Sequence, residues 1–143
     1  METVSPELYL RVQHFYARQM QSLDNGCFKE YADSFTPDGV FEHTPGAAPG
    51  RTPAGILAQI EESQRAQPVS DERKRHYFSQ LVVEPLPDGR FNATSYALII
   101  RIKPGRAAPE VRPSCVVHDV LAVDSDGIHV ARRRIKYDHL ADA

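Results

Sequence analysis

Residues 76–103 read HYFSQLVVEPLPDGRFNATSYALIIRIK, and they indicate the fold class. Two runs rich in β-branched and aromatic residues, 76–84 and 90–103, flank a turn sequence at 85–89 that contains proline, aspartate and glycine. Apolar runs on both sides of such a turn predict a β-hairpin of two antiparallel strands.

Two more runs of the same kind, 111–123 and 128–137, are joined by the turn sequence Asp124-Ser125-Asp126-Gly127. They predict a second hairpin in the same sheet. Strands of ten or more residues exceed the usual length of about five or six, and so long a sheet twists strongly. A strongly curved sheet can enclose a hollow on its concave side.

The first half of the chain instead has apolar residues at helical spacing. One helix is expected to begin at Ser5-Pro6, a capping serine followed by a proline in the first turn, and to end at Asn25-Gly26. A second helix is expected at about 27–35 and a third from 53 to about 66.

Between the last two helices, Thr36-Pro37-Asp38-Gly39 predicts a turn and Val40-Phe41-Glu42-His43 a short strand. Helices followed by long antiparallel strands indicate an α+β fold. We expect three N-terminal helices packed on one face of a strongly curved, mostly antiparallel sheet, with residues 1–143 forming a single domain.

Composition and charge exclude several classes of protein. A formal net charge of −2 provides no basic field for nucleic acid or an anionic membrane. Apolar runs such as 97–100 are far shorter than the ~20 residues of a membrane helix, and no secretory signal is expected at the N-terminus. Cys27 and Cys115 match no zinc or redox spacing and are expected to be buried or semi-buried thiols in a reducing cytoplasm.

The only basic run is the three arginines at 132–134, with Lys136 close by. On a strand these side chains alternate between faces, so they cannot form one phosphate-binding stripe. We expect Arg133 to form a structural ion pair, with Asp119 or Asp138 as its partner.

Side chains alternate between the two faces of a strand, and this alternation groups the residues of a candidate site. Phe41 and His43 share one face of their strand, and His76, Phe78 and Gln80 share a face of the next. Each set places an imidazole among apolar or aromatic neighbours. If these faces line the hollow, the histidines enter a partly desolvated space.

His118 has the same character, because it shares a face with Val116 and Val120 while Asp119 points to the other. Histidine titrates near neutrality, so it can remove a proton next to a carbonyl or protonate a leaving hydroxyl. We therefore predict that His43, His76 and His118 meet around one cavity as acid and base groups. His14, His129 and His139 are expected to be solvent-facing or structural.

Short motifs in a fixed order resemble the SnoaL-like branch of the nuclear-transport-factor-two-like superfamily. They are Phe15-Tyr16-Ala17-Arg18-Gln19-Met20, Leu23-Asp24-x-Gly26, Phe35-Thr36-x-Asp38-Gly39-x-Phe41, Gly50-Arg51, Arg75-His76 with Gln80, Ser95-Tyr96 and Arg133-x-Ile135-x-x-Asp138. The resemblance covers roughly residues 8–139.

This resemblance implies a cone-shaped α+β barrel, in which a strongly curved mixed, mostly antiparallel sheet wraps around the three N-terminal helices and leaves an apolar pocket open at its wide end. The family includes cyclases, dehydratases and isomerases of polyketide intermediates, and the non-catalytic β subunits of ring-hydroxylating dioxygenases. Its members usually work without a metal or organic cofactor and as dimers through the outer face of the sheet. The resemblance therefore implies no cofactor and a homodimer, whereas the charge and the short apolar runs are the reason to expect no nucleic-acid or membrane partner.

Comparison with scytalone-dehydratase-like members implies roles for single positions. The position of His76 matches a pocket histidine, that of His43 a pocket tyrosine, and that of His118 a pocket asparagine. The pocket aspartate of that group would fall near Gln21, which is a departure. Asp24 matches a common family aspartate and is expected mainly to be a helix-end cap or a turn residue.

Other residues are candidates for contacts with a flat aromatic substrate. Ordinary core packing is an equal alternative for the aromatic and sulfur-containing side chains among them. The expected substrate-binding residues are Tyr16, Met20, Phe41, Phe78, Gln80 and Tyr96. A three-histidine metal site is conceivable, but no His-x-Glu-x-His-type spacing supports it, so no metal is expected.

Two functions follow from these features. The first is a cofactor-independent cyclase, dehydratase or isomerase of small polyketide-type intermediates, with His76 as principal acid or base. The second is a non-catalytic small-molecule-binding or chaperone-like accessory protein, because one fold can host unrelated functions.

Overall fold

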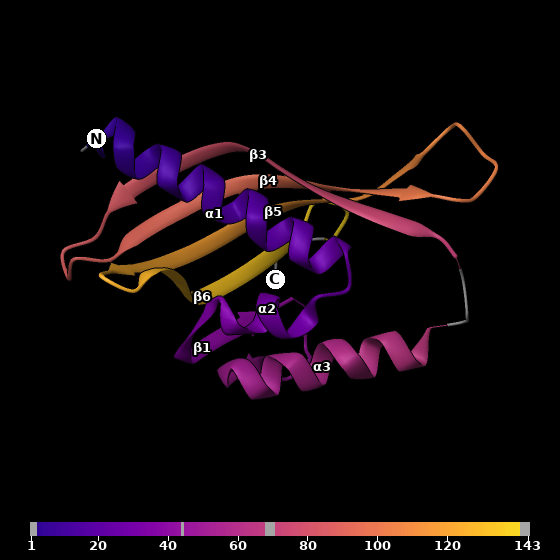
Figure 1. Ribbon diagram of the computed structural model, residues 1–143, viewed down its shortest axis with the longest axis horizontal. Coiled ribbons are helices and arrows are strands. Elements are labelled where there is room, and N and C mark those ends of the chain that lie inside the picture. Colours follow the sequence, from indigo (N-terminus) through magenta and orange to yellow (C-terminus); the bar gives the residue numbers. More distant parts are fainter. Residues whose placement is uncertain (1–2, 44, 68–70, 141–143) are drawn as a thin grey trace.

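The computed structural model of the protein describes residues 3–43, 45–67 and 71–140. The start of the N-terminus considered for a secretory signal, and residue 44 after the predicted short strand, lie outside these ranges. In chain order the elements are α1 (Pro6–Asp24), α2 (Phe28–Asp33), β1 (Phe35–Glu42), β2 (Gly50–Arg51), α3 (Thr52–Ala66), β3 (Arg73–Pro85), β4 (Phe91–Ile102), β5 (Glu110–Asp124) and β6 (Gly127–Tyr137) (Figure 1).

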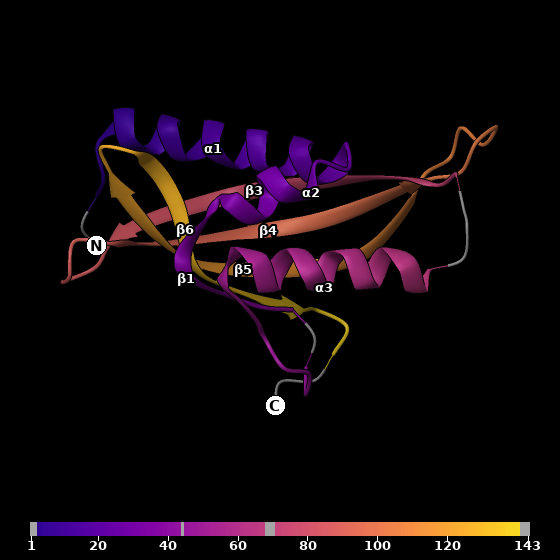
Figure 2. The ribbon, with the colours of Figure 1, turned by 60° about the horizontal axis from the view of Figure 1, so that its bottom comes forward.

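All six strands form one open, mixed sheet in the order β2-β1-β6-β5-β4-β3. Neighbouring strands are antiparallel except β1 and β6, which run parallel. The three helices lie on one side of this sheet (Figures 1 and 2). Helix α1 packs against β3, and α3 packs against β1 and β2, so the two long helices cover opposite ends of the sheet. The expected α+β architecture with a curved, mostly antiparallel sheet is confirmed.

Helix α1 begins as its sequence predicts. The Ser5 hydroxyl accepts a hydrogen bond from the backbone N–H of Leu8 at 3.1 Å, and Pro6 occupies the first turn. The helix buries one face against the sheet, at Val12, Tyr16, Gln19 and Met20. Because this face packs along β3, the C-terminal end of α1 lies beside the N-terminal half of β3.

The segment after α1 differs from the prediction. Helix α2 ends at Asp33, before residue 35, because the chain joins the sheet there: Val130 N–H donates to the Ser34 carbonyl at 2.9 Å. The predicted turn at 36–39 is instead the first part of β1, where the register with β6 shifts between Phe35 and Val40. Gly39 permits this close approach, because a Cβ there would lie 2.9 Å from the Cβ of Phe35.

Strand β3 changes its alternation at Gln80. This residue has a positive φ of 53°, and the register with β4 shifts between Ser79 and Val82. Such a bulge adds one residue to the strand and exchanges its faces. Leu81 is therefore buried, and Gln80, predicted to share the inner face with His76, is exposed.

Candidate functional site

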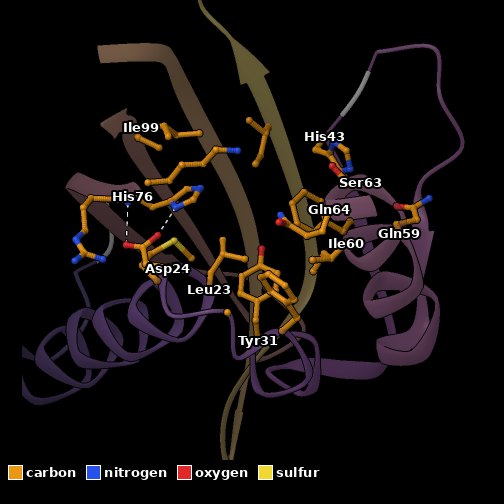
Figure 3. A pocket seen from close by; sticks show the side chains of 18 of the residues that line it. Leu23, Asp24, Tyr31, His43, Gln59, Ile60, Ser63, Gln64, His76 and Ile99 are labelled. Carbon is orange, nitrogen blue, oxygen red and sulfur yellow. Dashed lines mark hydrogen bonds and ion pairs between the residues drawn. The ribbon is translucent and has the colours of Figure 1, made fainter. Parts of the chain in front are cut away.

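A cavity of about 990 Å³ lies between the helices and the concave face of the sheet (Figure 3). Helix α1 contributes its last turn, α2 and α3 form further walls, and strands β3 to β6 supply the sheet side. Three of the predicted substrate-binding residues, Met20, Phe41 and Phe78, line it. This volume is at the upper end of the range of small-molecule sites, about 300–1,000 Å³.

The strongest polar feature of the wall is the pair of His76 and Asp24. His76 Nδ1 lies 2.6 Å from Asp24 Oδ1, and the backbone N–H of His76 donates to Oδ2 at 3.1 Å (Figure 3). The side chains are 19% and 8% exposed, so this contact is largely shielded from water. A carboxylate at Nδ1 holds the hydrogen on that nitrogen and leaves Nε2 available to the cavity.

The expectation that Asp24 caps the end of α1 is wrong. The residue at the C-terminal cap is Asn25, whose backbone N–H donates to the Gln21 carbonyl at 3.0 Å, and the next N–H, of Gly26, donates to the Leu23 carbonyl at 3.2 Å. Asp24 instead reaches from the last helical position to β3. No local pattern indicates this contact, because the two partners are 52 residues apart.

His43 follows β1 and lies across the cavity from His76, near Ser63 of α3 (Figure 3). Its ring meets the ring of Phe41 edge-on at a centroid distance of 5.0 Å. Burial lowers the pKa of His43, because desolvation disfavours the imidazolium form. The structure thus brings His43 and His76 to opposite walls of one cavity, as the alternation of the strands predicted.

The prediction is wrong for His118. The buried residues on this part of β5 are Cys115, Val117 and Asp119, so His118 points to the opposite, outer face of the sheet. Arg134 is its cross-strand neighbour on β6. Desolvation, followed by the charges of Arg134 and Lys136, lowers the pKa of His118.

The prediction that Tyr96 contacts the substrate in the cavity is also wrong. Strand β4 buries Ala93, Ser95 and Ala97, which fixes the inner face, and Tyr96 is 55% exposed on the outer face. Gln80 is excluded from the cavity by the bulge in β3. Neither residue lies on the wall of the cavity.

Tyr16 belongs to a buried polar cluster beneath the cavity. Its hydroxyl donates to Asp119 Oδ2 at 2.7 Å. Arg133 donates from Nε and Nη2 to the two Asp119 oxygens at 3.0 and 2.8 Å, from Nη2 to Gln19 at 2.7 Å, and from Nη1 to the Tyr31 hydroxyl at 3.0 Å. The expected Arg133–Asp119 ion pair is confirmed, and Tyr16 has its hydroxyl in this cluster rather than in the main cavity.

Tyr31 also lines the cavity and is not among the residues predicted from the sequence. The only signal was indirect: the sequence predicted an ion pair of Arg133 with Asp119 or Asp138, and the Tyr31 hydroxyl is a further partner of that arginine. A buried arginine requires several acceptors, and besides Asp119 these are two helical residues, Gln19 and Tyr31, that no spacing rule connects to the strands.

The two cysteines differ in environment. Cys115 is buried, and burial raises its pKa to about 11, whereas Cys27 is exposed, contrary to expectation. Within the described part of the chain, no group of three or more His, Cys, Asp or Glu side chains could hold a metal ion. In those same ranges no helix combines the length and the apolar character of a membrane span.

A family model described as SnoaL-like domain matches residues 5–134. The chain belongs to the SnoaL-like family. Its similarity to a solved structure of ActVI-ORFA from Streptomyces coelicolor reaches 38% identity and a TM-score of 0.88, covering 94% of this chain and 99% of that one. This confirms the resemblance and the fold that it implied.

Two other solved structures extend the comparison. A protein from Catenulispora acidiphila, in complex with S-DNPA, is 38% identical with a TM-score of 0.83 and covers 94% of this chain and 96% of that one. Aln2 from a Streptomyces species is 30% identical with a TM-score of 0.85, over 96% and 95% of the two chains. A search of the curated proteins found no match.

Proposed function

We propose that this SnoaL-like protein is a cofactor-independent acid/base enzyme that cyclises, dehydrates or isomerises a small polyketide-type intermediate of secondary metabolism. The observation that carries the proposal is the His76–Asp24 pair on the wall of a 990 Å³ cavity. The complex of a 38% identical relative with S-DNPA supports a small-molecule ligand.

In this mechanism His76 is the principal base. Its Nδ1–H donates to Asp24, and Nε2 takes a proton from the carbon next to a carbonyl group. The carboxylate stabilises the imidazolium that results and keeps the ring oriented. Returning the proton to another atom, or to a leaving hydroxyl, completes an isomerisation or a dehydration.

His43 supplies the second polar group on the opposite wall. Because burial lowers its pKa, His43 is neutral at pH 7 and serves as a hydrogen-bond donor or acceptor for the bound molecule. Two histidines in unlike surroundings can in this way divide acid and base roles.

Exchange of α-hydrogens for deuterium in 2-tetralone, a bicyclic ketone, tests the proton transfer without knowledge of the natural substrate. We expect the protein to accelerate this exchange, and His76→Gln to reduce the acceleration by about 10²–10⁴-fold, the usual contribution of general acid–base catalysis. His118→Gln is the matched control, because it removes an imidazole from the outer face.

Equal exchange by wild type and His76→Gln would contradict the proposal. Tight binding of 2-tetralone with no acceleration by the wild type would instead favour the non-catalytic accessory protein. Isothermal titration calorimetry of the same samples separates the two results, because it measures binding whether or not exchange occurs.

We also propose a cytoplasmic homodimer formed through the outer face of the sheet. Tyr77, Tyr96 and Leu98 are 57%, 55% and 39% exposed there, and Tyr77 pairs with Leu98 across β3 and β4. An exposed apolar patch of this kind is typical of an interaction surface. Sedimentation velocity should show a dimer that Tyr96→Lys dissociates, whereas Leu10→Lys, at a 67% exposed position on α1, should not.

A further inference from the structure

The floor of the cavity contains a tyrosine that the proton-transfer mechanism does not use. Tyr31, on α2, is 2% exposed and lines the cavity. Its ring is fixed between Phe35 and Phe41, at centroid distances of 5.7 and 6.3 Å. The hydroxyl is held in place by Arg133, whose Nη1 donates to it at 3.0 Å.

The hydrogen of this hydroxyl has no acceptor in the described ranges. Tyr31 accepts from Arg133 but donates to no protein group there, whereas the Tyr16 hydroxyl donates to Asp119 at 2.7 Å. Figure 3 shows the Tyr31 hydroxyl directed into the cavity, on the floor between the walls that hold His76 and His43. A buried donor without an acceptor destabilises the protein, and a ligand acceptor at this position would remove that loss.

Arg133 provides a second hydrogen-bond donor without an acceptor next to the Tyr31 hydroxyl. Its side chain has five N–H groups, and its hydrogen bonds within the described residues use one on Nε, two on Nη2 and one on Nη1. One Nη1–H therefore also remains beside the Tyr31 hydroxyl. A ligand atom that accepts hydrogen bonds fits this floor, and a second donor does not.

We propose that Tyr31 donates its hydroxyl hydrogen to a carbonyl oxygen of the ligand and stabilises the enolate oxygen that forms when His76 removes the neighbouring proton. The catalytic part of this assignment rests on the proposed function. It narrows the substrate class to ketones, or phenols in the reverse direction, whose oxygen is bonded to the carbon next to the one that loses its proton.

The step balances without any other reactant. The C–H electron pair becomes a carbon–carbon double bond, the carbonyl π pair moves to oxygen, and the proton passes to Nε2 of His76. Tyr31 keeps its own hydrogen, because burial raises its pKa more than the charge of Arg133 lowers it. The guanidinium hydrogen bond polarises the hydroxyl and makes it a stronger donor.

The hydrogen bond can be observed apart from catalysis with 2-tetralone labelled with ¹³C at the carbonyl. In the wild-type complex we expect the carbonyl resonance to lie downfield of its position in cyclohexane. Tyr31→Phe should remove most of this shift and weaken binding about three- to tenfold, the effect of one buried hydrogen bond. Tetralin, which has the same carbon frame without the oxygen, should bind both proteins equally.

Tyr16→Phe is the matched control, because it deletes a tyrosine hydroxyl from the same buried cluster, one that donates to Asp119. It should lower the melting temperature and leave the carbonyl shift unchanged. His76→Gln should reduce the acceleration of exchange by about 10²–10⁴-fold but also leave the shift unchanged, which separates failure of this inference from failure of the proposed acid/base function. In the exchange assay Tyr31→Phe should cost about 10²-fold, as removal of an oxyanion donor does.

If Tyr31→Phe does not fold, biosynthetic replacement of all six tyrosines by 3-fluorotyrosine provides the second measurement. The ring is nearly the same size and the phenol is more acidic, so the carbonyl resonance should move further downfield. No downfield shift in the wild type, no response to 3-fluorotyrosine, or equal shifts in wild type and Tyr31→Phe would each overturn the inference.

Discussion

Replacing Asp119 by asparagine should destabilise this protein more than any surface charge change. The Asp119 and Arg133 side chains are 0% and 1% exposed. The Asp119 carboxylate accepts hydrogen bonds from Arg133 at 3.0 and 2.8 Å and from Tyr16 at 2.7 Å. Asp119→Asn leaves the guanidinium buried without its counter-charge, which costs about 3–5 kcal/mol.

That loss is a large share of the folding free energy, since domains of this kind are stable by about 5–15 kcal/mol. Urea unfolding followed by far-UV circular dichroism measures it. With a slope of about 1–3 kcal/mol per molar urea, the midpoint should fall by at least about 1 M. The slope itself should not change if the native state keeps its compactness.

The surface pair of Lys29 and Asp33 provides the matched control. These side chains are 77% and 53% exposed, so Asp33→Asn should change the free energy of unfolding by less than about 1 kcal/mol. If Asp119→Asn cost no more than Asp33→Asn, the buried cluster would not hold the cavity floor, and the reasoning about Arg133 would be refuted.

Three other predictions concern single positions. The Ser95 hydroxyl is buried without a hydrogen bond to the described residues, so Ser95→Ala should leave the urea midpoint unchanged or raise it, and a clear loss would contradict this. Gln80 has a φ of 53°, so Gln80→Gly should raise the melting temperature by relieving backbone strain, and a fall would argue against strain at the bulge. The pKa of His43 is lowered by burial, so its NMR titration should have a midpoint below 6.5. Because the unfolded chain then binds the proton more readily than the folded protein, His43 should make the free energy of unfolding fall as the pH drops below about 6.5. If the free energy of unfolding of His43→Gln depended on pH as steeply as that of the wild type, this prediction would be wrong.

Local signals in the sequence predicted most of the framework. The cap at Ser5 and the period-two runs located α1 and the four long strands within a few residues of their observed bounds. Alternation also placed His43 and His76 correctly, because both follow the regular pattern of their strands up to that point. The same argument failed at Gln80, where one extra residue in β3 exchanges the two faces.

Alternation in a strand states which residues share a face, but it does not state which face is covered. For His118 and Tyr96 that choice depends on neighbours such as Asp119 and Ser95, whose burial is decided by the packing of α1 and α2 on the sheet. Propensity and spacing act over a few residues, so local patterns were enough to specify the three helices, the four long strands, their order and the family, but not the first part of β1, which they predicted as a turn. Packing of whole elements was needed to bring Asp24 to His76, 52 residues away, and Tyr31 to Arg133, 102 residues away, because no short-range preference acts across such separations.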